Sequence, residues 1–535
     1  MTTIHCRIKD YIQPFERSLA LLELATLAGA TPRALDGECA SGTEFVVVTE
    51  RPLSELAESL AYWELVSAGS FAYVTRQSLR ESTVNVVRNG IDLDTMKQLL
   101  PFQGAVPFPK RRCLRYGTHG IHEYRGKFFP QLVRALINIS GTRPGGLIAD
   151  PMSGSGTTLV EAALFGCRGI GLDMNPLSTF LGKTKCELLA ADAGELEASY
   201  RVVRESLLAP ELPGRSVLTY VEGLALPDQH YLSNWFGEQV LAGLDEIATT
   251  INRVGYAPAR NMMWVALSNI LRTVSWQKAD DLRVRKEVRL DVDLDPKREF
   301  LEEAARSIRA VLSFLHQERP TAVPTQRIEG GDARRCGNLW AEHLGKVDTV
   351  ITSPPYATAL PYLDTDRLSL CFLGLLPRPE HRRHDQQMIG NREVTEGLRR
   401  AYLARMQSDG GTLPRSVQQL VDHIGQLNDG TSAGFRRKNL PALLSNYFFD
   451  MREVLEGVFD VLKPGGEAFV VVGNNHTIAG GTRVEIETAN LLSEIAETIG
   501  FVVRPSLSME MLASRDIFRK NAMATEEILF LKKQA

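Results

Sequence analysis

The sequence has 535 residues, of which 44% are hydrophobic and 23% are charged, a composition typical of globular proteins and a length sufficient for one large catalytic domain and a smaller one. Its formal net charge of −3 excludes a polycation that coats nucleic acids indiscriminately. The amino terminus shows no signal-peptide pattern, and no apolar run approaches the roughly 20 residues that span a bilayer, so we expect a cytoplasmic protein without membrane contact. The seven cysteines show no paired C-x-x-C spacing, which predicts neither a disulfide framework nor a metal site.

The first 105 residues are predicted to form a small α/β domain. Apolar residues recur at the helical period in residues 18–28 and 54–65, and residues 44–48 read as a strand. Residues 101–109 contain three prolines and a glycine, which is typical of a linker.

A parallel βαβ unit is predicted further along the chain. Residues 147–150 form a short apolar run, a glycine turn follows, residues 157–164 continue as a helix, and residues 169–173 form the next strand. We therefore expect an α/β fold, a doubly wound Rossmann-like sheet, in a domain that extends over residues 110–535.

Two insertions are expected to interrupt this sheet. Residues 188–316 are largely helical, with apolar residues at helical spacing near the end of the segment. The sheet resumes at residues 347–351. A second insertion, residues 364–443, is polar, contains glycine and is locally basic. We expect a loop-rich segment, and it is the candidate region for recognition of the protein's target molecule. After it we predict a helix over 447–461, a strand over 468–472, a helix over 486–499 and two terminal strands.

The turn after the first strand is a candidate ligand loop, because ligands bind at the carboxyl ends of parallel strands. Its glycines leave room that a Cβ would fill, and the free N–H groups of the next helix could hold a carboxylate. The loop is not a Walker A, and Leu159 occupies the third glycine position of G-x-G-x-x-G. The alternative is a generic tight turn. The candidate residues are Asp150, Pro151, Ser153, Gly154, Gly156, Thr157 and Thr158.

Two further aspartates follow strands of the predicted sheet. Asp173 ends the second strand about 20 residues after the loop, the position at which a carboxylate meets ribose hydroxyls. Asp332 follows the strand-like residues 327–329 and could contact an adenine amino group. A helix cap and a turn aspartate, respectively, are the alternatives.

The most informative motif is Ser353-Pro354-Pro355-Tyr356. An exocyclic amine on an aromatic ring is a poor nucleophile, because its lone pair is delocalised, so its two N–H bonds must be held by acceptors. Ser353 offers a hydroxyl oxygen, and Pro354 offers a carbonyl whose direction the proline rings stiffen. Tyr356 offers a flat face for a base taken out of its stack. A plain proline turn is the alternative.

Together these segments resemble the amino-methyltransferases of DNA, which methylate cytosine N4 or adenine N6 with S-adenosylmethionine. The resemblance covers roughly residues 116–173 and 330 to the end. It implies that residues 150–158 hold the methionine part of the cofactor, that Asp173 holds its ribose and that Asp332 contacts its adenine. It also implies that residues 119–130 border the cofactor, with Lys127 and Phe128 as contacts, and that residues 353–356 are catalytic without a covalent intermediate or a metal.

The substrate is less closely defined by the sequence. Serine at position 353 favours cytosine N4 over adenine N6 in DNA. The amino-terminal 105 residues resemble the leading domain of tRNA guanine-N2 methyltransferases, which keeps an RNA substrate open, and a non-catalytic nucleic-acid-binding protein is a third hypothesis. The resemblance leaves a cognate restriction endonuclease open as a partner. Basic residues that could contact DNA phosphates or base edges, or form a solvated surface, are Arg382, Arg383, Arg436, Arg437 and Lys438.

Overall fold

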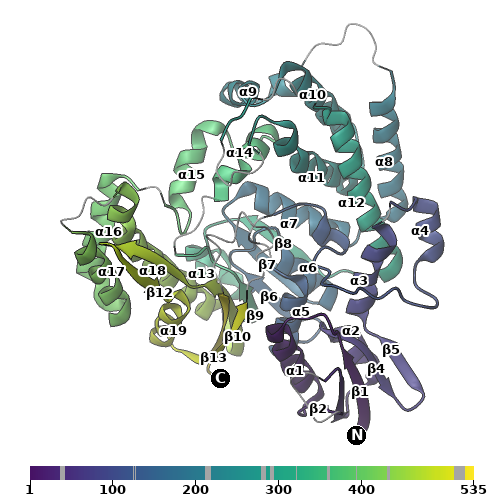
Figure 1. The fold of residues 1–535 in the computed structure, drawn as a ribbon, viewed down its shortest axis with the longest axis horizontal. Coiled ribbons are helices and arrows are strands. Elements are labelled where there is room, and N and C mark those ends of the chain that lie inside the picture. The colour runs from purple at the N-terminus through teal and green to yellow at the C-terminus, as the bar shows by residue number, and fades with distance from the viewer. Residues whose placement is uncertain are drawn as a thin grey trace.

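The described residues form two large β-sheets and a separate two-stranded hairpin, with a thick helical layer above the larger sheet (Figure 1). The fold was obtained as a computed structural model. It describes residues 1–35, 42–88, 90–124, 126, 128–210, 218–278, 285–288, 294–320, 322–357, 362–392, 394–429, 434–510 and 525–535. Among these residues, no helix has both the length and the apolar character that a bilayer crossing requires.

The amino-terminal sheet has five strands in the order β2-β3-β1-β4-β5, all paired antiparallel. The strands are β1 (Thr2–Ile8), β2 (Arg33–Ala34), β3 (Glu44–Thr49), β4 (Trp63–Ala68) and β5 (Phe71–Val74), and the helices of this region are α1 (Pro14–Ala28), α2 (Leu53–Ser59), α3 (Arg76–Val87) and α4 (Leu93–Leu99). The small α/β unit is therefore present. Its boundary near residue 105 stays a prediction.

The helix predicted over 54–65 is shorter than expected. α2 ends at Ser59, because Leu60 is extended with ψ 134°, and Trp63 starts a strand. Trp63 is fully buried in that strand and packs edge-on against Phe45 of β3. Packing between strands therefore overrides the helical period of this segment.

The larger sheet has seven strands in the order β13-β14-β10-β9-β6-β7-β8. They are β6 (Leu147–Asp150), β7 (Arg168–Asp173), β8 (Gln326–Gly330), β9 (Val347–Thr352), β10 (Leu462–Gly473), β13 (Phe501–Glu510) and β14 (Thr525–Lys533). The first five are parallel, and β14 pairs antiparallel with both of its neighbours. The doubly wound Rossmann-like sheet is thus confirmed, and its strand order reverses between β6 and β9.

Both faces of this sheet are buried. On one face, Leu147 and Ala149 share a hydrophobic cluster with the long helices α18 and α19. On the other face, Ile148 and Ile351 share a cluster with α5 and with α1 of the amino-terminal sheet. The helices around the sheet are α5 (Pro130–Ile139), α6 (Thr157–Phe165), α7 (Pro176–Leu188), α13 (Cys336–Leu339), α18 (Phe435–Val461) and α19 (Thr488–Ile499).

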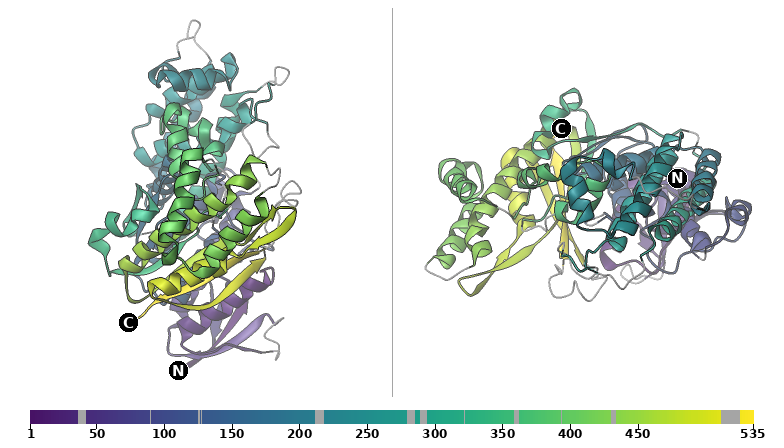
Figure 2. Two further views of the ribbon diagram at one scale, coloured as in Figure 1. Left: turned by 90° about the vertical axis from the view of Figure 1, so that its left-hand side faces the viewer. Right: turned by 90° about the horizontal axis from the view of Figure 1, so that it is seen from above.

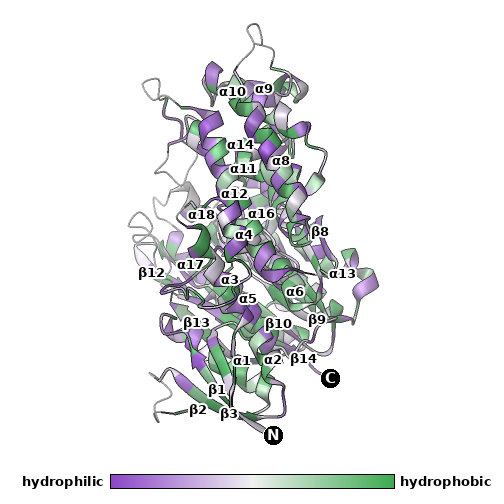
Figure 3. Ribbon diagram, turned by 90° about the vertical axis from the view of Figure 1, so that its right-hand side faces the viewer, coloured by the Kyte–Doolittle hydropathy of each residue, from purple (hydrophilic) through white to green (hydrophobic). Residues whose placement is uncertain are grey.

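The first insertion is helical, as expected. Its helices are α8 (Ala193–Leu208), α9 (Leu226–Ser233), α10 (Glu238–Asn252), α11 (Ala257–Val274) and α12 (Pro296–Glu318). Phe300, Ala304 and Ile308 lie on the buried face of α12. Figure 2 shows this layer at the end of the molecule opposite the amino-terminal sheet. In Figure 3 its helices carry both hydrophilic and hydrophobic residues, the pattern of helices with one buried face.

The second insertion differs from the expectation of a loop-rich segment. Its described part is mostly helical, with α14 (Tyr362–Phe372), α15 (His381–Gln387), α16 (Glu396–Asp409) and α17 (Arg415–Asn428). Val417, Val421 and Ile424 make one buried stripe on α17 within the cluster that contains α18. Because the rest of the segment is polar, its overall composition did not indicate this narrow apolar stripe. α18 also begins earlier than the predicted helix over 447–461.

The remaining elements are short. A hairpin of β11 (Asn475–Ala479) and β12 (Thr482–Ile486) precedes α19, and 3-10 turns cover Gly117–Gly120, Val221–Gly223, Ala333–Arg335, Ala341–His343, Arg378–Glu380 and Gly410–Thr412.

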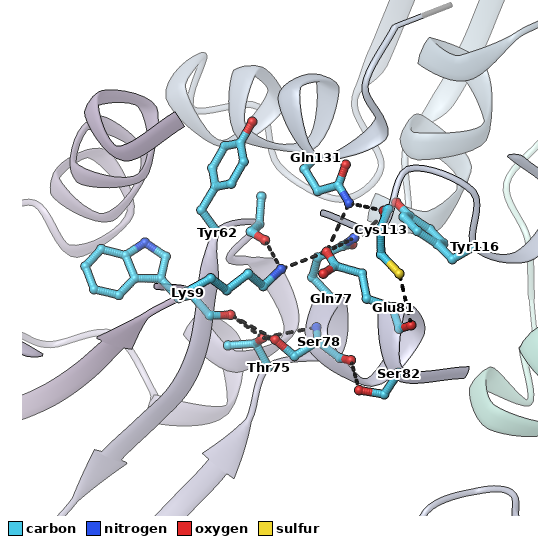
Figure 4. A network of polar contacts seen from close by, with 12 residues as sticks. Lys9, Tyr62, Thr75, Gln77, Ser78, Glu81, Ser82, Cys113, Tyr116 and Gln131 are labelled. Carbon is cyan, nitrogen blue, oxygen red and sulfur yellow. Dashed lines mark hydrogen bonds and ion pairs between the residues drawn. The ribbon is translucent and has the colours of Figure 1, made fainter. Parts of the chain in front are cut away.

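A buried polar network joins the amino-terminal sheet to α3 and α5 (Figure 4). The Lys9 ammonium, next to the end of β1, lies 2.7 Å from a Glu81 carboxylate oxygen on α3, and both side chains are almost fully buried. Gln77 and Gln131 also donate to this carboxylate, from α3 and α5 respectively. The network connects three elements of different chain segments, so it fixes how the smaller sheet sits against the larger unit.

Candidate active site

The predicted ligand loop and the Ser-Pro-Pro-Tyr motif lie next to each other. They follow β6 and β9, which pair directly through Ile148 with Thr349 and Ala149 with Val350. The Thr158 hydroxyl donates to the carbonyl of Ile351, over 3.4 Å. Two segments about 200 residues apart therefore meet at the edge where the strand order reverses, the usual ligand site of such sheets.

The two glycines of the loop have different roles. Both have positive φ, 50° at Gly154 and 81° at Gly156. A Cβ on Gly154 would lie 3.3 Å from the ring of Tyr124, whereas a Cβ on Gly156 would lie 2.8 Å from the Cα of Gly182 in α7. The expectation that both glycines leave room for a ligand is thus wrong for Gly156, because the backbone of α7 already fills that room.

Two buried hydroxyls of the loop suit a polar ligand. The Oγ atoms of Ser153 and Ser155 are buried without a hydrogen-bond partner among the described residues. Such hydroxyls cost free energy unless a partner satisfies them. Asp150, Pro151, Thr157 and Thr158 line the same turn and are buried. Burial raises the pKa of Asp150 to about 7, although the Thr158 hydroxyl opposes this rise.

Asp173 closes the loop from the end of β7. Its carboxylate accepts hydrogen bonds from the backbone N–H groups of Gly154 and Asn175, each over 2.8 Å. Asn175, not Asp173, caps α7 by accepting from Leu177. Burial raises the pKa of Asp173 to about 6. Asp173 therefore shapes the glycine turn, and the alternative that it caps the next helix is wrong.

Asp332 follows β8 and is engaged by an arginine that the sequence reasoning missed. Arg334 donates to both carboxylate oxygens of Asp332, and also to Asp450 on α18 over 3.0 Å. A further bond runs from Arg334 to the carbonyl of Gln387 at the end of α15, over 2.7 Å. Asp332 thus lies at the expected strand end within a charged cluster.

The second insertion reaches the same edge. On α15, His384 donates from Nε2 to the carbonyl of Met174, over 2.6 Å. On α14, the Asp366 carboxylate accepts from the Asn175 amide over 2.8 Å. Both contacts fall directly after Asp173. Helices α14 and α15 of the second insertion therefore contact the edge of the sheet where Asp173 lies, and the sequence did not indicate these contacts.

The predicted catalytic motif directly follows the end of β9. Pro354 is buried, and Ser353, Pro355 and Tyr356 are half-buried. The Tyr356 hydroxyl donates to the carboxylate of Glu526 at the start of β14. The ring of Tyr356 also packs against the hydrophobic cluster around α18. Glu526 is a second neighbour of the site that sequence reasoning missed.

The segment before α5 is only partly described. Lys127 lies outside the described residues. Phe128 is half-buried against the cluster that includes α1 and α5. His119 is buried, and its Nε2 lies 2.8 Å from a carboxylate oxygen of Glu161 on α6. This contact holds the segment against α6. Tyr124, whose hydroxyl lies 2.6 Å from the Ser178 hydroxyl, is the residue that faces Gly154.

The basic candidates lie on two helices. Arg382 and Arg383 are exposed on α15, and Arg437 and Lys438 are exposed in the first turn of α18. Arg436 lies in the same turn, and its side chain is outside the described residues. Among the described residues, no group of three His, Cys, Asp or Glu side chains could hold a metal ion.

Comparisons with known proteins agree with this geometry. Residues 122–200 match the family described as RMKL-like, methyltransferase domain. The chain is 23% identical to the type II methyltransferase M.BsoBI of Geobacillus stearothermophilus, over 72% of this chain and 78% of that protein. It is 24% identical to the type II methyltransferase M.MvaI of Kocuria varians, over 71% and 80%. A tRNA (guanine(10)-N2)-dimethyltransferase of Methanothermobacter thermautotrophicus is 33% identical over 15% of this chain and 26% of that protein. The chain is therefore similar to a methyltransferase domain over residues 122–200 and, over most of its length, to type II methyltransferases.

Proposed function

We propose that this protein is a DNA methyltransferase that transfers a methyl group from S-adenosylmethionine to cytosine N4 at a specific sequence. The observation that carries the proposal is the meeting of the glycine loop, Asp173 and Ser353 to Tyr356 at one edge of the sheet. The similarity to two type II methyltransferases over most of the chain supports a DNA substrate.

The cofactor would lie along the ends of β6, β7 and β8. The Ser153 and Ser155 hydroxyls and the first N–H groups of α6 would meet its methionine part, since these buried hydroxyls need partners. Asp173 would accept from the ribose hydroxyls. Asp332 would face the adenine amino group while it keeps its bond to Arg334. When bound, S-adenosylmethionine supplies an electrophilic methyl group.

The chain's own residues would prepare the nucleophile. The Ser353 hydroxyl and the Pro354 carbonyl would accept the two hydrogens of the cytosine amine, which directs its lone pair toward the methyl group. The face of Tyr356 would stack on the flipped base. The hydroxyl of Ser353 is a weak base, so the proton would leave to water after the nitrogen is methylated.

The basic faces of α15 and α18 would contact the DNA. Arg382 and Arg383 are exposed on α15. The next residue of this helix, His384, bonds to the carbonyl of Met174, next to the proposed cofactor site. Arg437 and Lys438, with Arg436, would add a second group of phosphate contacts. Neutralising Arg436, Arg437 and Lys438 together should weaken DNA binding and reduce its salt dependence by up to roughly three units of slope. An unchanged slope would remove this cluster from the interface.

The decisive experiment is transfer of a tritiated methyl group to DNA and to RNA, followed by mass spectrometry of the nucleosides. N4-methylcytosine in DNA is the expected product, and Ser353→Ala should lower its formation by roughly 10- to 1000-fold without loss of cofactor affinity. N6-methyladenine would contradict the cytosine assignment but would leave the proposed active site unchanged.

A second candidate is methylation of guanine N2 in tRNA. The 33% identity to a tRNA guanine-N2 enzyme over a short part of the chain favours it. Methylated guanine in tRNA, with no label in DNA, would replace the proposed substrate by this one. The type II relatives also suggest a cognate restriction endonuclease as a partner; protection of DNA carrying the methylated sequence from that nuclease would test it.

A further inference from the structure

Glu526 is brought to the catalytic motif from the far end of the chain. It stands 170 residues after Tyr356 in sequence, near the start of β14, where it pairs with Gly473 of β10. Its carboxylate accepts a hydrogen bond from the Tyr356 hydroxyl. β14 runs antiparallel to β10, so the start of β14 lies at the same edge as the ends of the parallel strands.

This contact restrains the tyrosine ring at its outer end. A tyrosine side chain has two rotatable bonds before the ring. Packing of Tyr356 against the hydrophobic cluster limits the motion of the part of the side chain near the backbone. The hydroxyl bond limits the remaining rotation of the ring plane. Stacking on a base depends on the direction of that plane, so the group that holds the hydroxyl controls how well the ring can stack.

We propose that Glu526 is a positioning residue that holds the Tyr356 ring in the orientation that receives the target base. The inference rests on the proposed DNA methylation, because it assigns Tyr356 the stacking role. Glu526 acts through Tyr356 and not by contact with the reacting atoms.

The neighbouring glutamate offers a matched control. Glu527 follows on the same strand, where successive side chains point to opposite faces. Its carboxylate accepts from the Ser506 hydroxyl, 3.0 Å away on β13. Both glutamates are half-buried. Removal of Glu527 therefore perturbs β14 to a similar degree without touching Tyr356.

The test is a double-mutant cycle with Glu526→Ala, Tyr356→Phe and the two together, with Glu527→Ala as control. The first two variants should each lower kcat/KM for methylation of DNA by roughly 10- to 100-fold, the range for loss of a hydrogen bond to a charged group. The double variant should lose no more than the worse single variant, because both remove one interaction. Glu526→Gln, whose amide oxygen can still accept, should recover much of the activity, and calorimetry should give unchanged affinity for S-adenosylmethionine.

A second readout follows the ring directly. With 2-aminopurine at the target position, wild type should quench the fluorescence of the flipped base by stacking, and Glu526→Ala should quench it less at saturating protein. Glu527→Ala should match wild type in both measurements. Losses that multiply in the double variant, or equal activity of Glu526→Ala and Glu527→Ala, would overturn the proposal while the proposed function stands. A wild-type protein that methylates no DNA would overturn the proposed function itself.

Discussion

Gly156 should support the fold more than the cofactor, and Gly156→Ala tests this directly. Its φ of 81° costs a residue with a Cβ roughly 1–2 kcal/mol. The new Cβ would also stand 2.8 Å from the Cα of Gly182, a backbone atom that cannot rotate away, and such overpacking costs roughly 1–3 kcal/mol. Together these terms predict that the free energy of unfolding falls by about 2–5 kcal/mol, a large share of the stability of an ordinary domain.

Urea denaturation followed by circular dichroism measures this loss, and Gly154→Ala is the matched comparison. Gly154 also has a positive φ, yet its Cβ would meet the Tyr124 ring at 3.3 Å, and a side chain can shift. We therefore expect Gly154→Ala to cost only about 1–2 kcal/mol while it weakens binding of S-adenosylmethionine in calorimetry. The reasoning is refuted if Gly156→Ala unfolds at the wild-type urea concentration, or if Gly154→Ala is the less stable of the two.

Four further outcomes are expected. Lys9→Met should lower the free energy of unfolding by about 3–5 kcal/mol, because it leaves the buried Glu81 carboxylate without its cation; a loss equal to that of Lys110→Met, at an exposed lysine, would contradict this. Because the pKa of Asp150 is raised to about 7, the folded chain keeps a proton that the unfolded chain loses above about pH 4, so stability should fall as the pH rises from about 4 to 7. Asp150→Asn should flatten this dependence in urea denaturation at several pH values. Because burial raises the pKa of Asp173 to about 6, and the ribose hydroxyls of a cofactor bound as proposed would favour its ionised form, affinity for S-adenosylmethionine should fall below about pH 6 by up to tenfold per unit, and Asp173→Asn should bind weakly at every pH in the same calorimetry. His384→Ala should raise the Kd for the cofactor roughly fivefold, the effect of one hydrogen bond, whereas the exposed His423→Ala should leave it unchanged.

Some of the fold could be predicted from local sequence. The strands at 147–150, 169–173 and 347–351 match β6, β7 and β9 to within one residue at each end. They are short and buried on both faces, so their apolar runs carry the signal without help from the rest of the chain. Asp150, Asp173 and Ser353 could be found for the same reason, because the two aspartates end β6 and β7 and Ser353 directly follows β9.

Elements stabilised by distant partners could not be predicted in this way. α2 stops at Ser59 because Trp63 is needed in a strand beside Phe45, and α17 is helical because a narrow apolar stripe packs against α18. Neither partner is visible in a local window of sequence.

The candidate site also combines features that the local sequence predicts with features that depend on distant partners. The types of the candidate catalytic residues, and the chemistry proposed for them, come from the sequence alone, because Ser353-Pro354-Pro355-Tyr356 is one local motif directly after a predicted strand. Only the tertiary structure decides what surrounds them. Gly182 fills the space beside Gly156, Arg334 engages Asp332, and Glu526 holds Tyr356. In two of these contacts, Gly182 and Glu526, the partner comes from another helix or strand, so its position depends on how the sheet is ordered and not on any pattern near the residue it contacts.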